Sequence, residues 1–283
     1  DLVERALTAR GGRGPGHAVV LGAGACTELP LARLARGCAM VTLVDLDGAS
    51  MERARHELPR ELRSRVRLLR TDISGGISAT LTTQLRAQPW ADLAQLDQHA
   101  VLDAAAACLE QSPVPDIVPG MVGSAAPYDV VISSLVLTQL FSLPLLDVLD
   151  TLAAVAPGMI GLQDAHPRYH AAAEAFRRRV ILAHLDLLAA LLEPSGAGAL
   201  ITDVSGHLLA GARKGDAAPE AERFALLPRD GFDLPTELAR RFTVDGKIRS
   251  WRWVTNLPNG AQPGRAYEVV GAVLRAGAGT SIR

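Results

Sequence analysis

The chain has 283 residues, enough for one large domain with a sizeable buried core. Hydrophobic residues make up 48% and charged residues 21%, a globular balance that excludes a largely disordered chain. Its 29 lysines and arginines nearly cancel 30 aspartates and glutamates, giving a net charge of −1. The chain therefore lacks the basic excess typical of proteins that bind nucleic acid or anionic membranes. No apolar run reaches the ~18 residues of a membrane span.

Three widely spaced cysteines, Cys26, Cys38 and Cys108, form no Cys-x-x-Cys pair and no cluster with histidines. This spacing indicates neither a disulfide framework nor a structural zinc, so we expect no metal. Nothing in the sequence points outside the cytoplasm. The many alanines, glycines and arginines are typical of a bacterial protein from a GC-rich genome.

Short apolar strands alternate with helices in the first half of the chain. This alternation indicates a parallel sheet covered by helices on both faces. In chain order, the patterns predict a helix at 2–9, a buried strand that starts at 17 and ends in glycines, a helix at 27–37, a strand at 40–45, a helix at 48–58 and a strand at 66–72.

The second half begins with a helical stretch and ends with alternating strands. The elements predicted there are a helix at 92–111, a strand at 128–134, a helix at 135–156 with a break near Pro144, a helix at 171–192, a strand at 199–205, irregular structure at 206–248 and an antiparallel hairpin of 250–257 and 266–275. We therefore expect an α/β fold, with a doubly wound, mostly parallel seven-stranded sheet that ends in an antiparallel hairpin.

A glycine turn follows the first predicted strand. Gly22 and Gly24 lack a Cβ, so the charged part of a nucleotide-type cofactor can approach the backbone there. A G-x-G pair alone is weak evidence, since such a turn also serves to pack a helix against a strand.

Two aspartates at the ends of the next two strands strengthen this interpretation. Asp45 ends the second strand about twenty residues after Gly22, where a carboxylate accepts ribose hydroxyls. Asp47, nearer the next helix, is assigned as its N-cap. Asp72 ends the third strand, where its carboxylate can accept a hydrogen bond from the exocyclic amine of adenine while Ile73 lies against the adenine ring.

Two departures from known nucleotide-binding motifs argue against a dinucleotide cofactor and against ATP hydrolysis. The dinucleotide fingerprint G-x-G-x-x-G requires glycine at position 27, which is Thr27. The sequence also has no G-x-x-x-x-G-K-[ST] loop for ATP hydrolysis.

At this point the sequence resembles the class I S-adenosylmethionine-dependent methyltransferases. The segments that carry the resemblance are VVLGAGACTEL, VTLVDLDGASMERAR, VRLLRTDIS, YDVVISSLVLTQL, LLEPSGAGALITDVS and the terminal hairpin. Cys26 stands where the family often has a third glycine, and we expect it to be a small filler and not a nucleophile. The resemblance implies that the cofactor is bound by Gly22, Ala23, Gly24, Asp45, Leu46, Asp72 and Ile73, with Ser133, Ser134 and Leu135 at its methionine end.

The resemblance also implies the activity. The chain is expected to be a single domain over 1–283, with helical cap insertions at about 76–127, 141–170 and 206–248. It would move a methyl group from S-adenosylmethionine to an O, N or C acceptor on a small molecule or peptide, leaving S-adenosylhomocysteine. The alternatives are an aminopropyl or aminocarboxypropyl transferase on the same fold, and a binding module that has lost catalysis.

Methyl transfer needs no fixed catalytic motif, so any base must lie in the substrate-side insertions. The run QDAHPRYH offers His166 and Tyr169, although a helix start capped by Asp164 is an alternative. His207 follows the fifth strand and is a further catalytic candidate, with Asp203 as the next choice.

Trp251 and Trp253 are two residues apart in a predicted strand and share one of its faces. Core packing is the favoured interpretation, and an aromatic wall for a substrate is the alternative.

Overall fold

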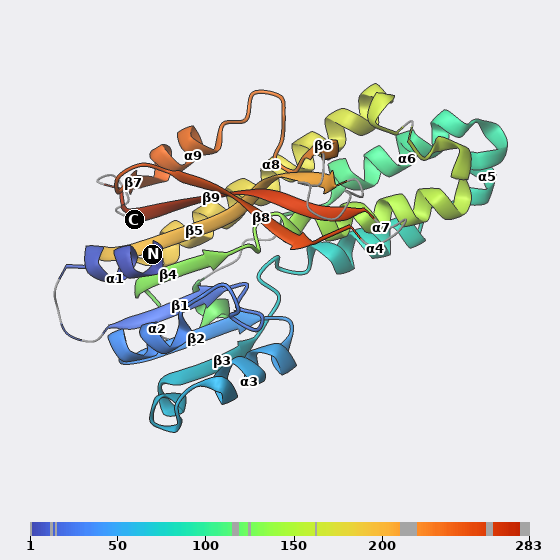
Figure 1. Cartoon of the computed structure of the whole chain (residues 1–283). Helices are drawn as coiled ribbons and strands as arrows, with labels where there is room; N and C mark the ends of the chain where they lie inside the picture. Colours follow the sequence, from blue (N-terminus) through green and yellow to red (C-terminus); the bar gives the residue numbers. More distant parts are fainter. Residues whose placement is uncertain are drawn as a thin grey trace.

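One mixed sheet runs through the described part of the chain (Figure 1). The computed structural model describes residues 2–11, 14, 16–114, 119–123, 126–161, 163–209, 220–258 and 263–277. The strands are β1 (His17–Leu21), β2 (Met40–Asp45), β3 (Val66–Arg70), β4 (Tyr128–Ser134), β5 (Leu192–Leu209), β6 (Glu220–Ala225), β7 (Phe242–Val244), β8 (Arg249–Asn256) and β9 (Gly264–Ala276).

The strand order is β3-β2-β1-β4-β5-β9-β7, with β6 paired to β5 and β8 paired to β9. Strands β1 to β5 run parallel, and β9 runs antiparallel to β5 and β8. The predicted α/β fold, with a mostly parallel sheet ending in an antiparallel hairpin, is confirmed. The described sheet has nine strands and not seven, because β6 and β7 form within 206–248, which was predicted to be irregular.

Helices cover both faces of the sheet, and each face has its own hydrophobic core. One core, which we call the α2 core, contains Leu34 and Met51; the other, the α8 core, contains Leu81, Phe141 and Phe176. Burial on both faces explains why the central strands are apolar along their length. The α2 core is covered by α1 (Leu2–Ala9), α2 (Leu31–Gly37) and α3 (Gly48–Glu57), and the α8 core by α4 (Ile77–Arg86), α6 (Gln98–Gln111), α7 (Gln139–Val155), α8 (Pro167–Leu191) and α9 (Leu234–Arg241).

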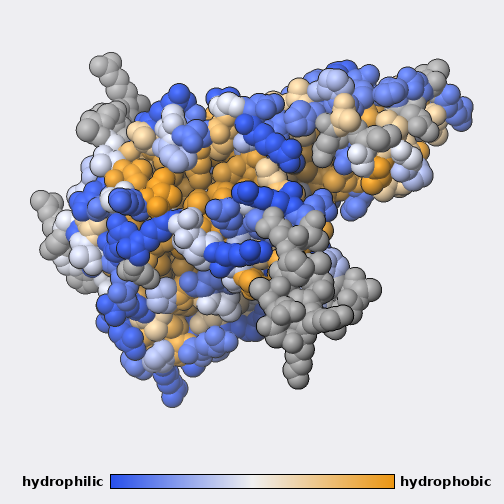
Figure 2. Space-filling model, turned by 45° about the horizontal axis from the view of Figure 1, so that its top comes forward, coloured by the Kyte–Doolittle hydropathy of each residue, from blue (hydrophilic) through white to orange (hydrophobic). Residues whose placement is uncertain are grey.

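A helical arm projects from one side of the sheet (Figure 1). It consists of α4, α5 (Trp90–Leu96), α6, α7 and the first half of α8, and it comes mostly from the segments predicted as insertions at 76–127 and 141–170. Hydrophobic residues gather in a hollow at its base (Figure 2). None of the described helices is long and apolar enough to cross a membrane.

Several predicted helix boundaries were wrong. The helix predicted at 92–111 is two helices, α5 and α6, and α4 precedes them. The break predicted near Pro144 is absent, and α7 continues through the proline. The residues on either side, Phe141 and Leu145, are buried in the α8 core, so packing holds both halves of this helix in line.

Strand β5 is much longer than the predicted 199–205. On one side, its first part pairs with β4 and its second part with β6; on the other side, β9 pairs with both parts, from Ala197 to Leu209. The register shifts between Asp203 and Ser205, so Val204 is an extra residue in a β-bulge. This bulge separates the parallel part of the sheet from an antiparallel extension beyond the end of β4.

A buried hydrogen bond joins β4 to α8. The Ser133 hydroxyl lies 2.8 Å from Nε2 of His184, and both side chains are buried. Nδ1 of His184 has no hydrogen-bond partner among the described residues, so a second ring proton would have no acceptor there. Burial lowers the pKa of His184 to about 4.

We expect this histidine to make the stability of the fold depend on pH. The folded chain keeps His184 neutral, whereas the unfolded chain takes up a proton below about pH 6.5. Stability should therefore fall by on the order of 3 kcal/mol as the pH drops from 6.5 toward 4. Urea unfolding at several pH values should show that His184→Gln removes most of this loss. Parallel pH curves for the two proteins would contradict the assignment.

Candidate functional site

The turn after β1 has a left-handed backbone at three positions: Gly22 (φ +69°), Gly24 (φ +48°) and Cys26 (φ +53°). The two glycines serve different purposes. A Cβ on Gly22 would lie 2.4 Å from Cβ of Val136, so this glycine lets the chain after β4 pass close by. A Cβ on Gly24 would meet nothing within 4 Å, which leaves open space in front of the turn. Ala23, between them, is buried in the α2 core.

The carboxylate of Asp45 joins two loops at the end of β2. Its Oδ2 accepts a hydrogen bond from the Gly24 amide at 2.9 Å, and its Oδ1 accepts one from the Asp47 amide at 2.9 Å. Each oxygen keeps further acceptor capacity, because a carboxylate has about four lone-pair positions. Asp47 is the N-cap of α3, as predicted, and its side chain accepts from the Ser50 amide.

Asp72 organises the turn after β3 in a similar way. Its two oxygens accept hydrogen bonds from the amides of Ser74 and Gly76 at 2.8 and 3.1 Å. These bonds close the chain around Ile73, which is buried and faces the same pocket as Asp72. The turn thus places a carboxylate and an apolar side chain next to each other.

A cavity of about 140 Å³ lies at the carboxyl end of β1, β2 and β3. Pockets for whole ligands usually measure ~300–1,000 Å³, so this one suits only part of a cofactor. Among the described residues, its lining includes two carboxylates and no lysine or arginine. Its lining residues are Gly22, Asp45, Leu46, Thr71, Asp72, Ile73, Ser74, Ser78, Val136, Gln139, Leu140 and Leu143.

Five predicted cofactor residues line this cavity: Gly22, Asp45, Leu46, Asp72 and Ile73. The lining residues missed by sequence reasoning come from the turn after β3, the start of α4, the loop after β4 and the start of α7. The α7 residues were missed because they are apolar or neutral and look like the ordinary start of a buried helix. The spacing of positions 139, 140 and 143 places them on one face of a helix, and this was the signal that could have identified them.

The end of β4 lies beside the cavity but does not line it. The Ser133 hydroxyl contacts His184 inside the core, and Ser134 is also buried. Leu135 has φ +53°, unusual for a residue with a Cβ, and its amide donates to the carbonyl of Ile201 on β5. At this edge the side chains of Ser133 and Ser134 are therefore turned away from solvent.

Asp203 on β5 is fixed to the loop that follows β4. The Thr138 hydroxyl donates a hydrogen bond to Oδ1 of Asp203. Asp203 is partly buried, and this burial raises the pKa of its carboxyl group. A carboxylate with a raised pKa is a suitable proton acceptor, and Val136, two residues before Thr138, lines the cofactor cavity.

His166 and Tyr169 are located at the start of α8, in the arm. Nδ1 of His166 accepts from the Tyr169 amide and so caps the helix, in place of the Asp164 cap that was considered. The His166 ring stacks on His99, and Tyr169 is buried in the α8 core. At 1.5 Å per residue, the start of α8 lies roughly 27 Å along the helix from His184, which contacts the end of β4. The structure does not bring these two residues to the cavity at the ends of β1, β2 and β3.

His207 lies in the antiparallel extension of β5. Its Nε2 is 3.3 Å from the Ser205 hydroxyl, and the side chain is buried. The bulge at Val204 places Ser205 and His207 on the α8-core side of the sheet, whereas Asp203 pairs with Val269 of the α2 core. His207 and Asp203 therefore lie on opposite faces.

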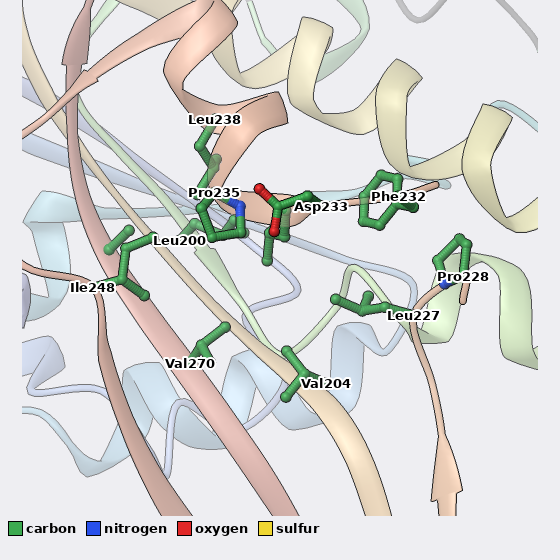
Figure 3. A pocket seen from close by; sticks show the side chains of 12 residues that line it. Leu200, Val204, Leu227, Pro228, Phe232, Asp233, Pro235, Leu238, Ile248 and Val270 are labelled. Carbon is green, nitrogen blue, oxygen red and sulfur yellow. The ribbon is translucent and has the colours of Figure 1, made fainter. Parts of the chain in front are cut away.

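A second cavity, of about 240 Å³, lies between the sheet and α9 (Figure 3). Its walls are apolar, with Leu200, Val270 and Phe232 among them, and Asp233 is the one charged residue among the described residues of its lining. The Asp233 carboxylate caps α9 through the Thr236 amide, so this cavity offers little for binding a polar reacting group.

Comparisons with known proteins found similarity only among solved structures. No protein-family model matches the chain, and a search of curated proteins found no match. The chain is similar to a putative methyltransferase from Bacillus halodurans C-125 (9% identity, TM-score 0.46, covering 98% of this chain and 99% of that one). It is also similar to the glycopeptide N-methyltransferase MtfA complexed with S-adenosyl-L-methionine (15% identity, TM-score 0.41, covering 98% of this chain and 94% of that one). A third similar structure is that of the ribosomal protein L11 methylase of Lactobacillus delbrueckii subsp. bulgaricus (10% identity, TM-score 0.38, covering 97% of this chain and 76% of that one).

These similarities are remote. We therefore base the function on the side chains around the cavity.

The cysteine in the glycine turn should be chemically inert in the folded protein. Burial raises the pKa of the Cys26 thiol to about 12, with the nearby Glu28 and Asp45 adding to the effect. At pH 8 only about one thiol in ten thousand is then ionised. We expect iodoacetamide to leave Cys26 unmodified at pH 8 in the native protein and to modify it in 6 M guanidinium. Labelling of the native protein at Cys26 would contradict this expectation.

Proposed function

We propose that this chain binds S-adenosylmethionine at the edge where β1, β2 and β3 end, and that it transfers the methyl group to an O, N or C acceptor on a small molecule or peptide. The observation that carries the proposal is the charge of the cavity. Asp45 and Asp72 face it, and none of the described lysines and arginines lines it. A site with this charge disfavours phosphates and favours a nucleoside that carries positive charge.

The cavity residues fit the adenosine part of this cofactor. Asp45 retains acceptor capacity for ribose hydroxyls, and Asp72 for the amine of the base. Leu46 and Ile73, both in the lining, offer apolar surface to an aromatic ring. The open space in front of Gly24 leaves room for the remainder of the molecule, which the cavity is too small to enclose.

When bound, S-adenosylmethionine supplies a methyl group on a positively charged sulfur, which is already a good leaving group. The protein then has to align the acceptor and take up its proton where one must be lost. Asp203 supports the second task through its raised pKa and its attachment to Thr138, next to the cavity-lining start of α7. We include the helical arm and the antiparallel extension in one domain with this site.

A thermal-shift measurement tests the identity of the cofactor. S-adenosylhomocysteine should raise the melting temperature, because a ligand that binds only the native state stabilises it. NAD and ATP carry phosphates into a cavity with two carboxylates, so neither should do so at equal concentration. Equal stabilisation by NAD would rule out the proposed cofactor.

A pair of aspartate variants tests the ribose contact. Asp45→Ala should weaken binding of S-adenosylhomocysteine roughly 10- to 150-fold, since it removes a charge-assisted acceptor worth ~1.5–3 kcal/mol. Asp47→Ala is the matched control, because this side chain caps α3 and does not line the cavity. Calorimetry should show that the affinity of Asp47→Ala for S-adenosylhomocysteine is within about twofold of wild type. An unchanged dissociation constant for a folded Asp45→Ala variant would remove Asp45 from the site.

A further inference from the structure

Beyond the end of β4 the sheet continues as an antiparallel extension of four strands. Its order is β6-β5-β9-β8, formed by the second half of β5 and its partners. Figure 1 shows these strands running past the ends of the parallel strands toward the arm. The extension therefore forms a wall next to the edge where the proposed cofactor site lies.

Aromatic side chains form a row across this extension. Trp253 on β8 pairs with Tyr267 on β9, Tyr267 pairs with Gly206 on β5, and Gly206 pairs with Phe224 on β6. Directly paired residues in adjacent strands project from the same face of a sheet. Trp253, Tyr267 and Phe224 thus lie side by side on one face, and all three remain partly exposed.

Gly206 is the position that makes the row continuous. A Cβ there would lie 2.1 Å from Cζ of Phe224 and 2.2 Å from its Cε2. The Phe224 ring therefore lies directly over the Gly206 backbone and extends toward Tyr267. Any larger residue at 206 would push the ring away from the row.

The row is on the α2-core face of the sheet, whereas Ile73 and Leu140 of the cavity lining belong to the α8 core. The row is connected to the proposed site through Asp203, which lies on the face of the row and accepts a hydrogen bond from Thr138 in the loop after β4. Trp253 and Tyr267 pack against the α2 core, and so does Leu135 at the end of β4. Val269, two residues after Tyr267, belongs to the same core and pairs with Asp203. The Asp203 carboxylate is therefore next to the aromatic row on the same face.

Trp251 shares this face, as predicted, but it has a different neighbourhood. Its ring lies 3.1 Å from the position of a Cβ on Gly271, where Leu2 of α1 also packs. Trp251 is nevertheless 40% exposed, and Trp253 is the one of the two that packs against the α2 core, so the core-packing interpretation applies to Trp253 in part and not to Trp251. The row that contains Trp253 crosses β8 two residues after Trp251.

We propose that the row Trp253–Tyr267–Phe224 binds the methyl acceptor, and that the acceptor is a flat aromatic molecule whose N–H or O–H group points toward Asp203. This inference rests on the proposed function, since it concerns the second substrate of the same site. Three adjacent ring faces select a planar ring through stacking. The Asp203 carboxylate lies on one side of the row, next to its middle, and suits a group that must give up a proton. Exposed Arg265, two residues before Tyr267, lies on the other side of the row.

A pair of simple probes tests this inference without any turnover. The aromatic probe is 2-naphthol, and its saturated counterpart, decahydro-2-naphthol, has the same fused skeleton and hydroxyl group but no ring face. Saturation-transfer NMR on the full chain, with S-adenosylhomocysteine present, measures the dissociation constants of both. We expect 2-naphthol to bind roughly three- to tenfold more tightly than the saturated compound.

Variants locate the binding on the row. Phe224→Leu and Trp253→Leu should each remove most of the preference for 2-naphthol, and Trp253→Phe should retain it because a ring remains. Val254→Ala is the matched control, since Val254 is exposed on the opposite face of the same strand. Affinity for S-adenosylhomocysteine should stay within twofold of wild type in all four.

The results separate the two proposals. If S-adenosylhomocysteine binds but the two probes bind equally, or if folded Phe224→Leu and Trp253→Leu variants keep the preference, the aromatic acceptor site is wrong and the cofactor proposal stands. If S-adenosylhomocysteine fails to bind the wild-type chain, the proposed function itself is wrong.

Discussion

The carboxylate of Asp45 is the contact on which the proposed cofactor site depends. One side chain at the end of β2 accepts amide hydrogen bonds from Gly24, in the turn after β1, and from Asp47, at the start of α3. Parallel pairing of β1 with β2 brings both amides to the same edge of the sheet. The turn after β1 and the start of α3 thus bind the same carboxylate. Asp45 therefore holds the two loops in place and also contributes negative charge to the cavity.

Much of this arrangement follows from local sequence. The buried strands from His17, at 40–45 and at 128–134 are each built around a short, mostly apolar run, so their type and parallel pairing were predictable. Asp45 and Asp72 were predictable for the same reason, because strand-end residues of a parallel sheet meet at one edge. Local pattern and global fold agree in this half of the chain.

The remainder depends on contacts between distant residues. Strand β5 continues to Leu209 because β6 and β9 pair with it there, and none of the three segments predicts that pairing alone. The polar run at 163–170 resembled a catalytic cluster, but the length of α8 carries His166 and Tyr169 out to the arm. The position of Asp203 beside Thr138 depends on the order of β4 and β5 in the sheet, which spacing alone does not reveal.

The position of β9 has a consequence for the order of folding. This strand follows the other described strands in sequence, yet it lies between β5 and the edge formed by β7 and β8. During synthesis, strands β1 to β5 leave the ribosome well before β9, so the cavity around Asp45 can form while β5 still has an unpaired edge. The extension with its aromatic row can be assembled only after β9 has also emerged. A nascent chain would thus form the proposed cofactor edge before the proposed acceptor surface.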